Sequence, residues 1–211
     1  MSEQQFVELR AVAGKVSRET FDKLKAFEAE FRKWNKGINP VAPSTLDNLW
    51  SRHILDSAQL LSIAGDANRW VDLGTGGGFP GAVVALLLAE RNSACIHLVE
   101  SNRKKAAFLQ STLGRLGAPA RVLPLRIEEA AQAIGLADVV TARALAPLPA
   151  LLELAEPWFK TGAKALFHKG KEFRTELANC RDGWNLDLLE HRSLVDGDGV
   201  ILEIRNVSRA R

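Results

Sequence analysis

The sequence predicts an α/β fold in which helices cover both faces of a mostly parallel sheet. An apolar run at 70–73 ends at the glycine-rich turn 74–81, and an alanine- and leucine-rich run follows at 82–89. Downstream, strand-like and helical segments alternate, which indicates right-handed crossovers between parallel strands. Near the C-terminus, Asp-Gly-Asp-Gly at 196–199 separates two strand-like segments and indicates an antiparallel hairpin. Together these observations predict a Rossmann-like sheet with an antiparallel C-terminal addition.

The strands and helices of this sheet are expected after residue 65. The strands, parallel first and the hairpin last, are expected at 70–73, 95–99, 121–125, 137–141, 163–167, 184–193 and 200–206. The helices between them are expected at 82–89, 102–117, 148–159 and 171–180. We therefore expect residues 66–211 to form the Rossmann-like domain as one compact unit, and residues 1–65 to form an N-terminal helical extension.

Apolar residues in the extension recur at steps of three and four, as on one face of an amphipathic helix. These stripes run over 6–16 and 21–34, so two helices are expected, or one long helix weakened at Gly14. Ser17, with Glu19 in the first turn, would start the second helix. The aromatic residues of both stripes are expected in the core rather than on a surface that stacks RNA bases.

Residues 35–43 carry a glycine and two prolines and are expected to form a loop. Ser-Thr-Leu-Asp at 44–47 is similar to a capping box and predicts a helix that extends to about residue 63. On this helix Arg52 and Asp56 are four residues apart and could form a surface ion pair. His53 could be a structural or a functional histidine, and its spacing does not decide between the two.

The composition is that of a soluble globular protein, since 46% of the 211 residues are apolar and 25% are charged. No apolar run approaches the roughly 20 residues that span a bilayer, and the N-terminus lacks a signal-peptide pattern. The two cysteines give no disulfide framework, and Cys95 is expected to be a buried free thiol. These features predict a cytoplasmic protein without a membrane segment, and we expect a monomer. The net charge of +3 permits nucleic-acid binding without requiring it.

The glycine turn formally fits the dinucleotide fingerprint at Gly76, Gly78 and Gly81. That match begins three residues after the strand ends and contains Pro80. Counted from the strand instead, the third glycine position is occupied by Phe79. An NAD site is therefore disfavoured but stays open, as does a tight turn that binds nothing.

Asp72 lies in the strand immediately before the turn, which continues as Gly74-x-Gly76-x-Gly78. A carboxylate there can order the loop and hold a cationic amino group, directly or through water, whereas it would repel a pyrophosphate. Asp-x-Gly-x-Gly-x-Gly is similar to the first motif of S-adenosylmethionine-dependent methyltransferases. We therefore expect the sheet of a class I methyltransferase, with S-adenosylmethionine as the cofactor and Asp72, Gly74, Gly76 and Gly78 among the residues that bind it.

In sheets of this kind, ligands bind beyond the carboxyl ends of the strands. Glu100 closes the second strand and could accept hydrogen bonds from both ribose hydroxyls of a nucleoside cofactor. After the third strand, Ile127 could contact the adenine face and Glu128 its amino edge. The alternative for Glu128 is a charge that complements the N-terminus of the following helix.

The segment 141–147 follows the fourth strand, where methyltransferases of this class commonly present their catalytic residues. It contains neither an Asn-Pro-Pro-Tyr-type motif nor a nucleophilic cysteine, which favours an acceptor that is already nucleophilic and needs only positioning. Arg143 could donate hydrogen bonds to a base edge or to the cofactor carboxylate. His-Lys-Gly-Lys at 168–171 could bind RNA phosphates or be a solvated basic face. We expect no general base and no metal.

Several motifs occur in the order and spacing of one family: Trp34-Asn35, Arg-His-Ile-Leu-Asp-Ser at 52–57, the turn with its aspartate at 72–81, Ala-Arg-Ala at 142–144 and Lys169-Gly170. Over residues 20–206 the chain resembles the bacterial small-subunit rRNA guanine-N7 methyltransferases, also called glucose-inhibited division protein B. The resemblance implies methylation of N7 of a guanine, guanine 527, in 16S rRNA of the small ribosomal subunit. Alternatives are a methyltransferase for another substrate and a cofactor-binding module without catalysis.

The resemblance also implies roles for individual residues. It places the cofactor contacts at Gly74, Phe79, Ile127, Glu128 and Arg143. Candidates for positioning the acceptor are Arg143 and Lys169. Candidates for binding RNA are Arg52, His53, Lys169 and Lys171.

Overall fold

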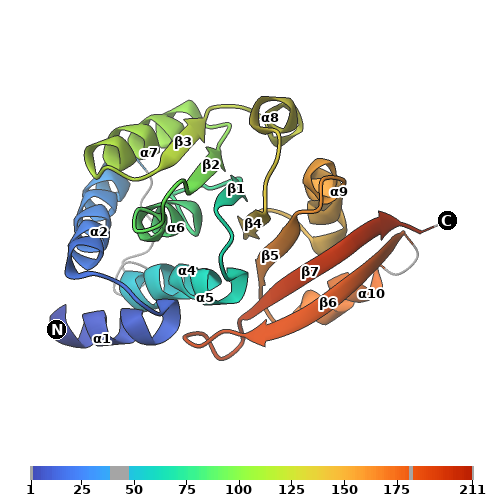
Figure 1. The fold of residues 1–211 in the computed structure, drawn as a ribbon, viewed down its shortest axis with the longest axis horizontal. Coiled ribbons are helices and arrows are strands. Elements are labelled where there is room, and N and C mark those ends of the chain that lie inside the picture. The colour runs from blue at the N-terminus through green and yellow to red at the C-terminus, as the bar shows by residue number, and fades with distance from the viewer. Residues whose placement is uncertain (1, 39–47, 181–182, 211) are drawn as a thin grey trace.

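The computed structural model describes residues 2–38, 48–180 and 183–210, which form one mixed sheet with helices on both faces (Figure 1). The strands are β1 Arg69–Leu73, β2 Cys95–Val99, β3 Ala120–Leu123, β4 Val139–Arg143, β5 Lys164–Lys169, β6 Trp184–Arg192 and β7 Val200–Arg209. The helices are α1 Ser2–Ala13, α2 Arg18–Ile38, the π-helix η1 Trp50–Leu55, α4 Asp56–Ala58, α5 Leu60–Ala64, α6 Gly81–Leu88, α7 Arg103–Arg115, α8 Ile127–Ile134, α9 Leu148–Phe159 and α10 Phe173–Ala178.

The strand order β3-β2-β1-β4-β5-β7-β6 confirms the predicted architecture. Strands β1 to β5 are parallel, and β7 runs antiparallel to both β5 and β6. The chain moves outward from β1 to β3 and then returns to place β4 on the other side of β1. The carboxyl ends of β1 and β4 therefore flank the switch point at which such sheets bind ligands.

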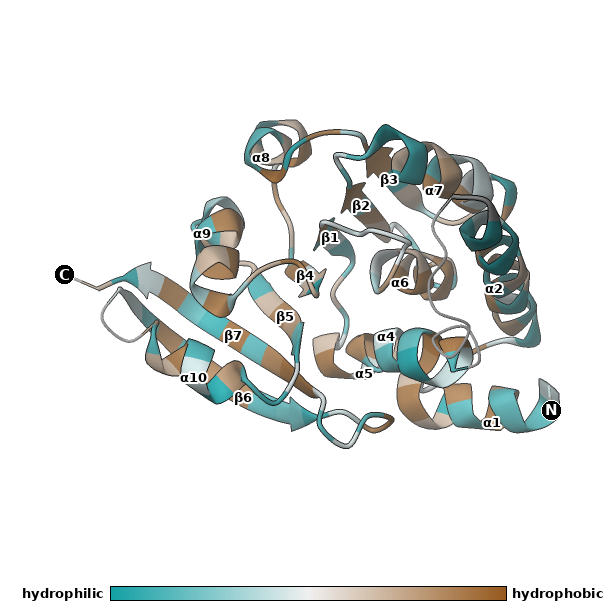
Figure 2. Cartoon of the chain, turned by 180° about the vertical axis from the view of Figure 1, so that it is seen from behind, coloured by the Kyte–Doolittle hydropathy of each residue, from teal (hydrophilic) through white to brown (hydrophobic). Residues whose placement is uncertain are grey.

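Alternate residues of the central strands face two separate apolar cores. Trp70 and Ile96 pack with α6 and the N-terminal helices, whereas Val71 and Val99 pack with α8 and α9. Figure 1 shows α6 and α9 on opposite sides of the sheet. Strand β6 carries both hydrophilic and hydrophobic residues (Figure 2), as expected for a strand with one face toward solvent, whereas the first five residues of β7, between β5 and β6, are all buried.

Aromatic rings join α2 to the glycine turn. Phe27 is fully buried, and its ring centroid lies 5.7 Å from that of Phe79; the Phe31 centroid lies 5.1 Å from Phe79. The second helix begins near Ser17 as predicted, since Ser17 Oγ accepts a hydrogen bond from the Thr20 N–H at 3.1 Å. The prediction that the aromatic residues of both stripes lie in the core is confirmed for Phe21, Phe27 and Phe31, whereas Phe6 and Trp34 are half-buried. Helix α2 thereby holds the turn in place from one side.

The N-terminal helices and the sheet share the first of the two cores, in which Leu9 and Leu24 pack in the same cluster as Trp70. The division into an extension at 1–65 and a domain at 66–211 stays a prediction. Within the described ranges, no helix is both long and apolar enough to cross a membrane.

Predicted boundaries around the second part of the extension are wrong. Helix α2 continues to Ile38, so the start of the expected 35–43 loop is helical. The capping sequence 44–47 lies outside the described residues. The single helix expected up to residue 63 is instead the π-helix η1 followed by the short helices α4 and α5. Cys95 is half-buried rather than buried.

Strands β4 and β5 extend further than predicted, which changes the setting of the residues at their ends. Arg143 pairs with His168 across β4 and β5, and Lys169 pairs with Val200 of β7. These side chains therefore project from hydrogen-bonded strands and not from loops. The neighbouring strands supply the backbone partners that extend β4 and β5, and a single sequence window does not reveal those partners.

We predict that Phe27→Ala lowers the free energy of unfolding by about 3–5 kcal/mol, because it removes a fully buried ring from between α2 and the turn. Val7→Ala serves as the control, since Val7 is 56% exposed, and should change stability by less than about 0.5 kcal/mol. Urea denaturation followed by circular dichroism measures both. Equal stability of the two variants would contradict the packing described for Phe27.

Candidate functional site

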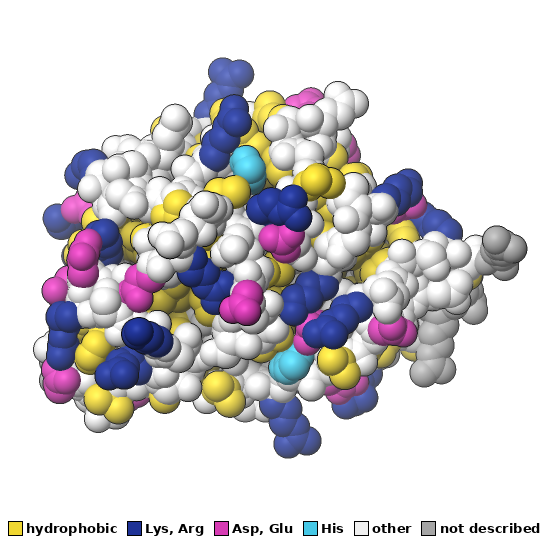
Figure 3. Space-filling view, viewed as in Figure 1, with side chains coloured by type: hydrophobic (Ala, Val, Ile, Leu, Met, Phe, Trp, Pro, Cys, Tyr) yellow, Lys and Arg dark blue, Asp and Glu magenta, His cyan; other side chains and the backbone are white. Residues whose placement is uncertain are grey.

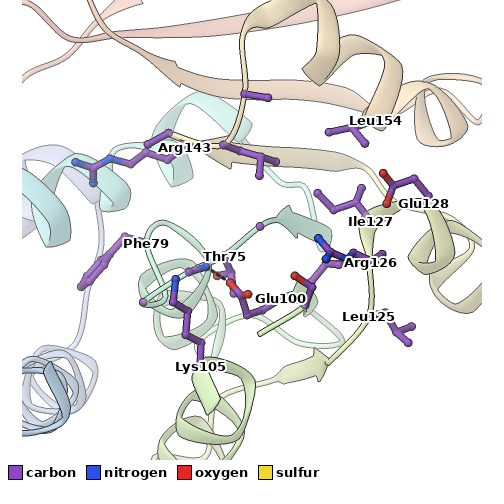
Figure 4. A pocket seen from close by; sticks show the side chains of 18 of the residues that line it. Thr75, Phe79, Glu100, Lys105, Leu125, Arg126, Ile127, Glu128, Arg143 and Leu154 are labelled. Atoms are coloured by element: carbon purple, nitrogen blue, oxygen red, sulfur yellow. Dashed lines mark hydrogen bonds between the residues drawn. The ribbon is translucent and has the colours of Figure 1, made fainter. Parts of the chain in front are cut away.

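A cavity of about 620 Å³ lies at the carboxyl ends of β1, β2 and β4, which is within the size range of small-ligand sites. Its wall includes many of the residues singled out in the sequence: Gly74, Gly76, Phe79, Glu100, Ile127, Glu128, Arg143 and His53. Figure 4 shows Glu100 near Thr75, Ile127 and Glu128 on another part of the wall, and the Arg143 guanidinium directed away from them. The cavity therefore offers a carboxylate, an apolar surface and a cation at separate places.

Two glycines give the turn its shape at the cavity wall. Gly74 has φ of +63°, and a Cβ there would lie 2.6 Å from Leu145 Cδ1. Gly76 has φ of +58°, and a Cβ there would meet no atom closer than the Gly74 carbonyl oxygen at 3.8 Å. A side chain at Gly76 would therefore be strained and would project into open space beside the cavity wall.

Glu100 links the turn to the end of β2. Its Oε2 accepts a hydrogen bond from the Gly76 N–H at 2.9 Å, and its Oε1 accepts one from the Asn102 N–H at 2.7 Å. Because each carboxylate oxygen can accept two hydrogen bonds, both oxygens keep a lone pair for donors such as ribose hydroxyls. The backbone thus fixes the carboxylate in place at the cavity wall.

Asp72 organises the turn from below and does not line the cavity. It is fully buried; Oδ2 accepts from the Gly81 N–H at 2.9 Å and Oδ1 from the Thr141 hydroxyl at 2.7 Å. Burial raises the pKa of this carboxyl to about 6, against the effect of its hydrogen bonds. The structure supports the predicted ordering of the loop by Asp72. It does not support a direct contact with a ligand, because turn atoms cover the carboxylate.

Gly78 is also a packing position. A Cβ there would lie 2.8 Å from both the Ala82 Cβ and a methyl group of Leu109, so the glycine lets α6 and α7 approach the turn. It does not line the cavity. The predicted cofactor contact of Gly78 is therefore not supported.

Ile127 and Glu128 lie where β3 leads into α8, and both line the cavity. Ile127 presents an apolar surface that suits the face of a purine ring. Glu128 is exposed in the first turn of α8, so it can also complement the helix dipole. Both interpretations of Glu128 are compatible with its position.

His53 lies at the cavity wall beside Phe79, with ring centroids 5.1 Å apart. Burial, with the positive charge of Arg143, lowers the pKa of His53 to about 4. The ring is therefore neutral near pH 7 and does not act as a phosphate-binding cation. If His53 binds RNA, as predicted, the neutral ring would contact a base or a ribose and not a phosphate.

Asp56 pairs with Arg143 and not with Arg52, so the predicted surface pair on the helix is wrong. Asp56 is 6% exposed, and its Oδ2 lies 3.6 Å from Arg143 Nη1. The Asp56 N–H donates to the carbonyls of Ser51 and His53 because η1 is a π-helix. Arg143 Nη2 donates to the Arg52 carbonyl at 2.8 Å. The irregular helix thus presents both a carboxylate and a carbonyl to one guanidinium group.

Lys169 lacks the free ammonium group that a phosphate contact requires. Its Nζ lies 2.6 Å from Glu176 Oε2 and donates to the Ala146 carbonyl at 2.8 Å, and the side chain is only 8% exposed. A phosphate contact would compete with these two partners, but Lys169 lines a cavity at the carboxyl ends of β4 and β5, so its role in positioning the acceptor stays a prediction. Lys171 and Arg52 are exposed, and their side chains have no hydrogen bond or ion pair among the described residues, so both remain candidates for RNA contact.

Lys and Arg side chains are spread over the face seen in Figure 3, with acidic side chains between them. No single basic patch dominates this view. Candidates for RNA contact are cations without an acidic partner among the described residues, and these include Arg52, Lys171 and, at the first cavity, Lys105 and Arg126. Long-range attraction of RNA by this face is expected to be modest.

The sequence did not reveal Asp56 as a buried partner of Arg143, and it assigned His168 only to the basic segment 168–171 and not to a place beside Asp56. His168 Nε2 lies 3.0 Å from the Asp56 carbonyl and 3.6 Å from Asp56 Oδ2. The 52–57 motif contained Asp56, but its spacing from Arg52 suggested only a local pair. The contact between His168 Nε2 and the Asp56 carbonyl joins residues 112 apart in the chain.

The strand order, the glycine turn at the switch point and the cavity beside it define the fold of a class I S-adenosylmethionine-dependent methyltransferase. Solved structures agree at the level of the fold. An O-methyltransferase from Bacillus cereus in complex with SAH gives a TM-score of 0.58 at 16% identity, covering 98% of this chain and 100% of that one. A cofactor-bound protein from MTB gives a TM-score of 0.58 at 16% identity, and the match covers 93% of this chain and 94% of that one.

Sequence comparison identifies the family. The model of rRNA small subunit methyltransferase G matches residues 20–204, and the chain belongs to this family. The protein of that name from Chelativorans sp. (strain BNC1) is 60% identical over 209 residues, covering 99% of this chain and all of the relative. The protein of that name from Brucella canis is 55% identical over 204 residues, and the match covers 97% of this chain and 96% of the relative.

We predict that Glu100→Ala weakens S-adenosylmethionine binding by roughly 1.5–3 kcal/mol, because it removes a charged acceptor from the cavity wall. Glu129→Ala is the matched control, since Glu129 is exposed on α8 and does not line the cavity. Isothermal titration calorimetry measures both affinities, and circular dichroism checks the fold. An unchanged affinity in Glu100→Ala would show that this carboxylate does not contact the cofactor.

Proposed function

We propose that this protein transfers the methyl group of S-adenosylmethionine to N7 of a guanine in the 16S rRNA of the small ribosomal subunit. The observation that carries the proposal is the near full-length match to relatives named ribosomal RNA small subunit methyltransferase G. The cavity at the switch point supports it, since it combines a fixed carboxylate with an apolar surface. The same proposal places the protein in the cytoplasm, acting as a monomer.

The residues present suit the cofactor. Glu100 would accept hydrogen bonds from the ribose, Ile127 would cover one face of the adenine, and the backbone at Gly74 and Gly76 would lie along the amino-acid part. Bound there, the cofactor supplies an electrophilic methyl group on a sulfonium centre. The cavity wall carries the carboxylates of Glu100 and Glu128 as well as the cations Lys105, Arg126 and Arg143, so it can meet both the positive sulfonium and the negative carboxylate of the cofactor.

The chemistry needs orientation rather than proton transfer. Guanine N7 carries a lone pair and no proton, so its lone pair forms the new N–C bond as the S–C bond breaks. The sulfur leaves as a neutral thioether, and the guanine ring takes the positive charge. Holding the reacting atoms in line can supply roughly 7–11 kcal/mol of the barrier. No described side chain has to act as a general base.

A related enzyme acting on another substrate and a cofactor-binding protein without catalysis are the alternatives. We expect labelled S-adenosylmethionine to methylate small subunits from cells that lack this protein, and mass mapping to find the methyl group on one guanine. Small subunits from cells that contain the protein serve as the control and should accept no label. Label in protein or in a small molecule only would refute the proposal, and binding without transfer would favour the non-catalytic alternative.

We predict that the rate of transfer is constant from about pH 6.5 to 8.5, because N7 has no proton to lose. In this window Asp72, with a pKa of about 6, is mainly ionised, and His53, with a pKa of about 4, is neutral. Single-turnover rates at saturating cofactor would show this. A tenfold rise per pH unit would mean that a base deprotonates the acceptor, and N7 would not be the target.

A further inference from the structure

A second cavity of about 430 Å³ adjoins the first at the carboxyl ends of β4 and β5. Both cavities are lined by Arg143 and by the segment 144–146. Ala144 in this shared segment has φ of +51°, an uncommon conformation for a residue with a side chain. The second cavity is further lined by Asp56, His168 and the hairpin residue Asp196. It lies beside the cofactor cavity, where the acceptor of a methyl group has to be.

Asp56 fixes the polar groups of this cavity. Its Oδ1 accepts from Gln59 Nε2 at 2.7 Å and from Ser193 Oγ at 3.0 Å. Its Oδ2 lies 3.6 Å from both Arg143 Nη1 and His168 Nε2. Arg143 and His168 are paired neighbours on β4 and β5, so their side chains leave the sheet side by side. The cluster is therefore held from the helix, the sheet and the hairpin.

Two buried polar atoms of this cluster have no hydrogen-bond partner among the described residues, namely Arg143 Nη1 and His168 Nδ1. His168 Nε2 contacts the Asp56 carbonyl, which can only accept, so Nε2 carries the hydrogen. Burial lowers the pKa of His168, which keeps the ring neutral. Nδ1 is then a bare acceptor. The wall of the cavity thus holds one donor and one acceptor that are covered from solvent and make no hydrogen bond, which is costly for each, and Arg143 Nη1 has only its ion pair with Asp56 at 3.6 Å.

This pair matches one edge of guanine. Guanine carries the acceptor O6 next to the donor N1–H, whereas adenine carries a donor amino group next to a bare nitrogen acceptor. An adenine at the same place would set donor against donor and acceptor against acceptor. N7 lies on the other side of O6 and stays free in this arrangement.

We propose that the second cavity receives the acceptor guanine, with Arg143 Nη1 donating to O6 and His168 Nδ1 accepting from N1–H. This rests on the proposed function, and it assigns guanine selectivity to His168. Asp56 is a positioning residue that orients both groups. N7 then faces the first cavity and the methyl group. Arg143 joins the two sites.

The test uses His168→Gln, in which the amide nitrogen can still donate to the Asp56 carbonyl but no acceptor remains at the Nδ1 position. We expect kcat/KM for methyl transfer to small subunits to fall about tenfold, as for one lost hydrogen bond. The Kd for S-adenosylmethionine should stay within about twofold, since His168 does not line the first cavity. The control His191→Gln changes a histidine of β6 that lines neither cavity and should leave both constants unchanged.

A second measurement does not depend on folding of the variant or on transfer. Wild-type protein saturated with S-adenosylhomocysteine is titrated with guanosine or adenosine 5′-monophosphate, and guanosine monophosphate should bind at least about tenfold more tightly. Equal binding of the two nucleotides, or a wild-type kcat/KM in His168→Gln, would overturn the inference. Absence of transfer by the wild-type protein, with the nucleotide preference retained, would instead refute the proposed function and leave the guanine site standing.

Discussion

The rest of the site depends on the buried carboxylate of Asp72. It accepts hydrogen bonds from the first residue of α6 and from Thr141 on β4, so a single group joins the strand before the turn, the helix after it and the strand across the switch point. Burial without partners would be unfavourable for a carboxylate, and these bonds offset much of that cost. Gly81 is required beside it, because a Cβ would collide with the carboxylate. The shape of the turn follows from this contact.

A second buried carboxylate, Asp56, performs a comparable task between the N-terminal segment and the sheet. The π-helix η1 turns both Asp56 and the Arg52 carbonyl toward Arg143. A segment that is 91 residues from Arg143 in the chain, counted from Arg52, thereby becomes part of the wall of both cavities. The Arg-His-Ile-Leu-Asp-Ser motif thus supports the same site as the glycine turn, since His53 lines the first cavity and Asp56 the second.

The cations near the site have two different roles. Arg143, paired with the buried Asp56, and Lys169, paired with the half-buried Glu176, are held in fixed positions and contribute geometry. Others have no acidic partner among the described residues; of these, Lys171, Arg52 and Arg126 are exposed and can approach phosphates. Buried pairs are expensive to break, whereas exposed charges act mainly on association and are weakened by salt. The positions of Arg143 and Lys169 should therefore depend little on salt, whereas contacts of the exposed cations with RNA phosphates should weaken as the salt concentration rises.

The sequence by itself determined the parallel sheet, the terminal hairpin, the glycine turn and the acid at Glu100, because these depend on local patterns and on rules of connection. It also placed the chain within one family through motifs that are contiguous. Only the tertiary structure decided the partners of the charged residues. Arg52 and Asp56 are neighbours on a helix, yet Asp56 pairs across the fold with Arg143, and Lys169 is neutralised by Glu176. Ion pairs depend on distance in space, and sequence spacing measures that distance only within a helix or strand.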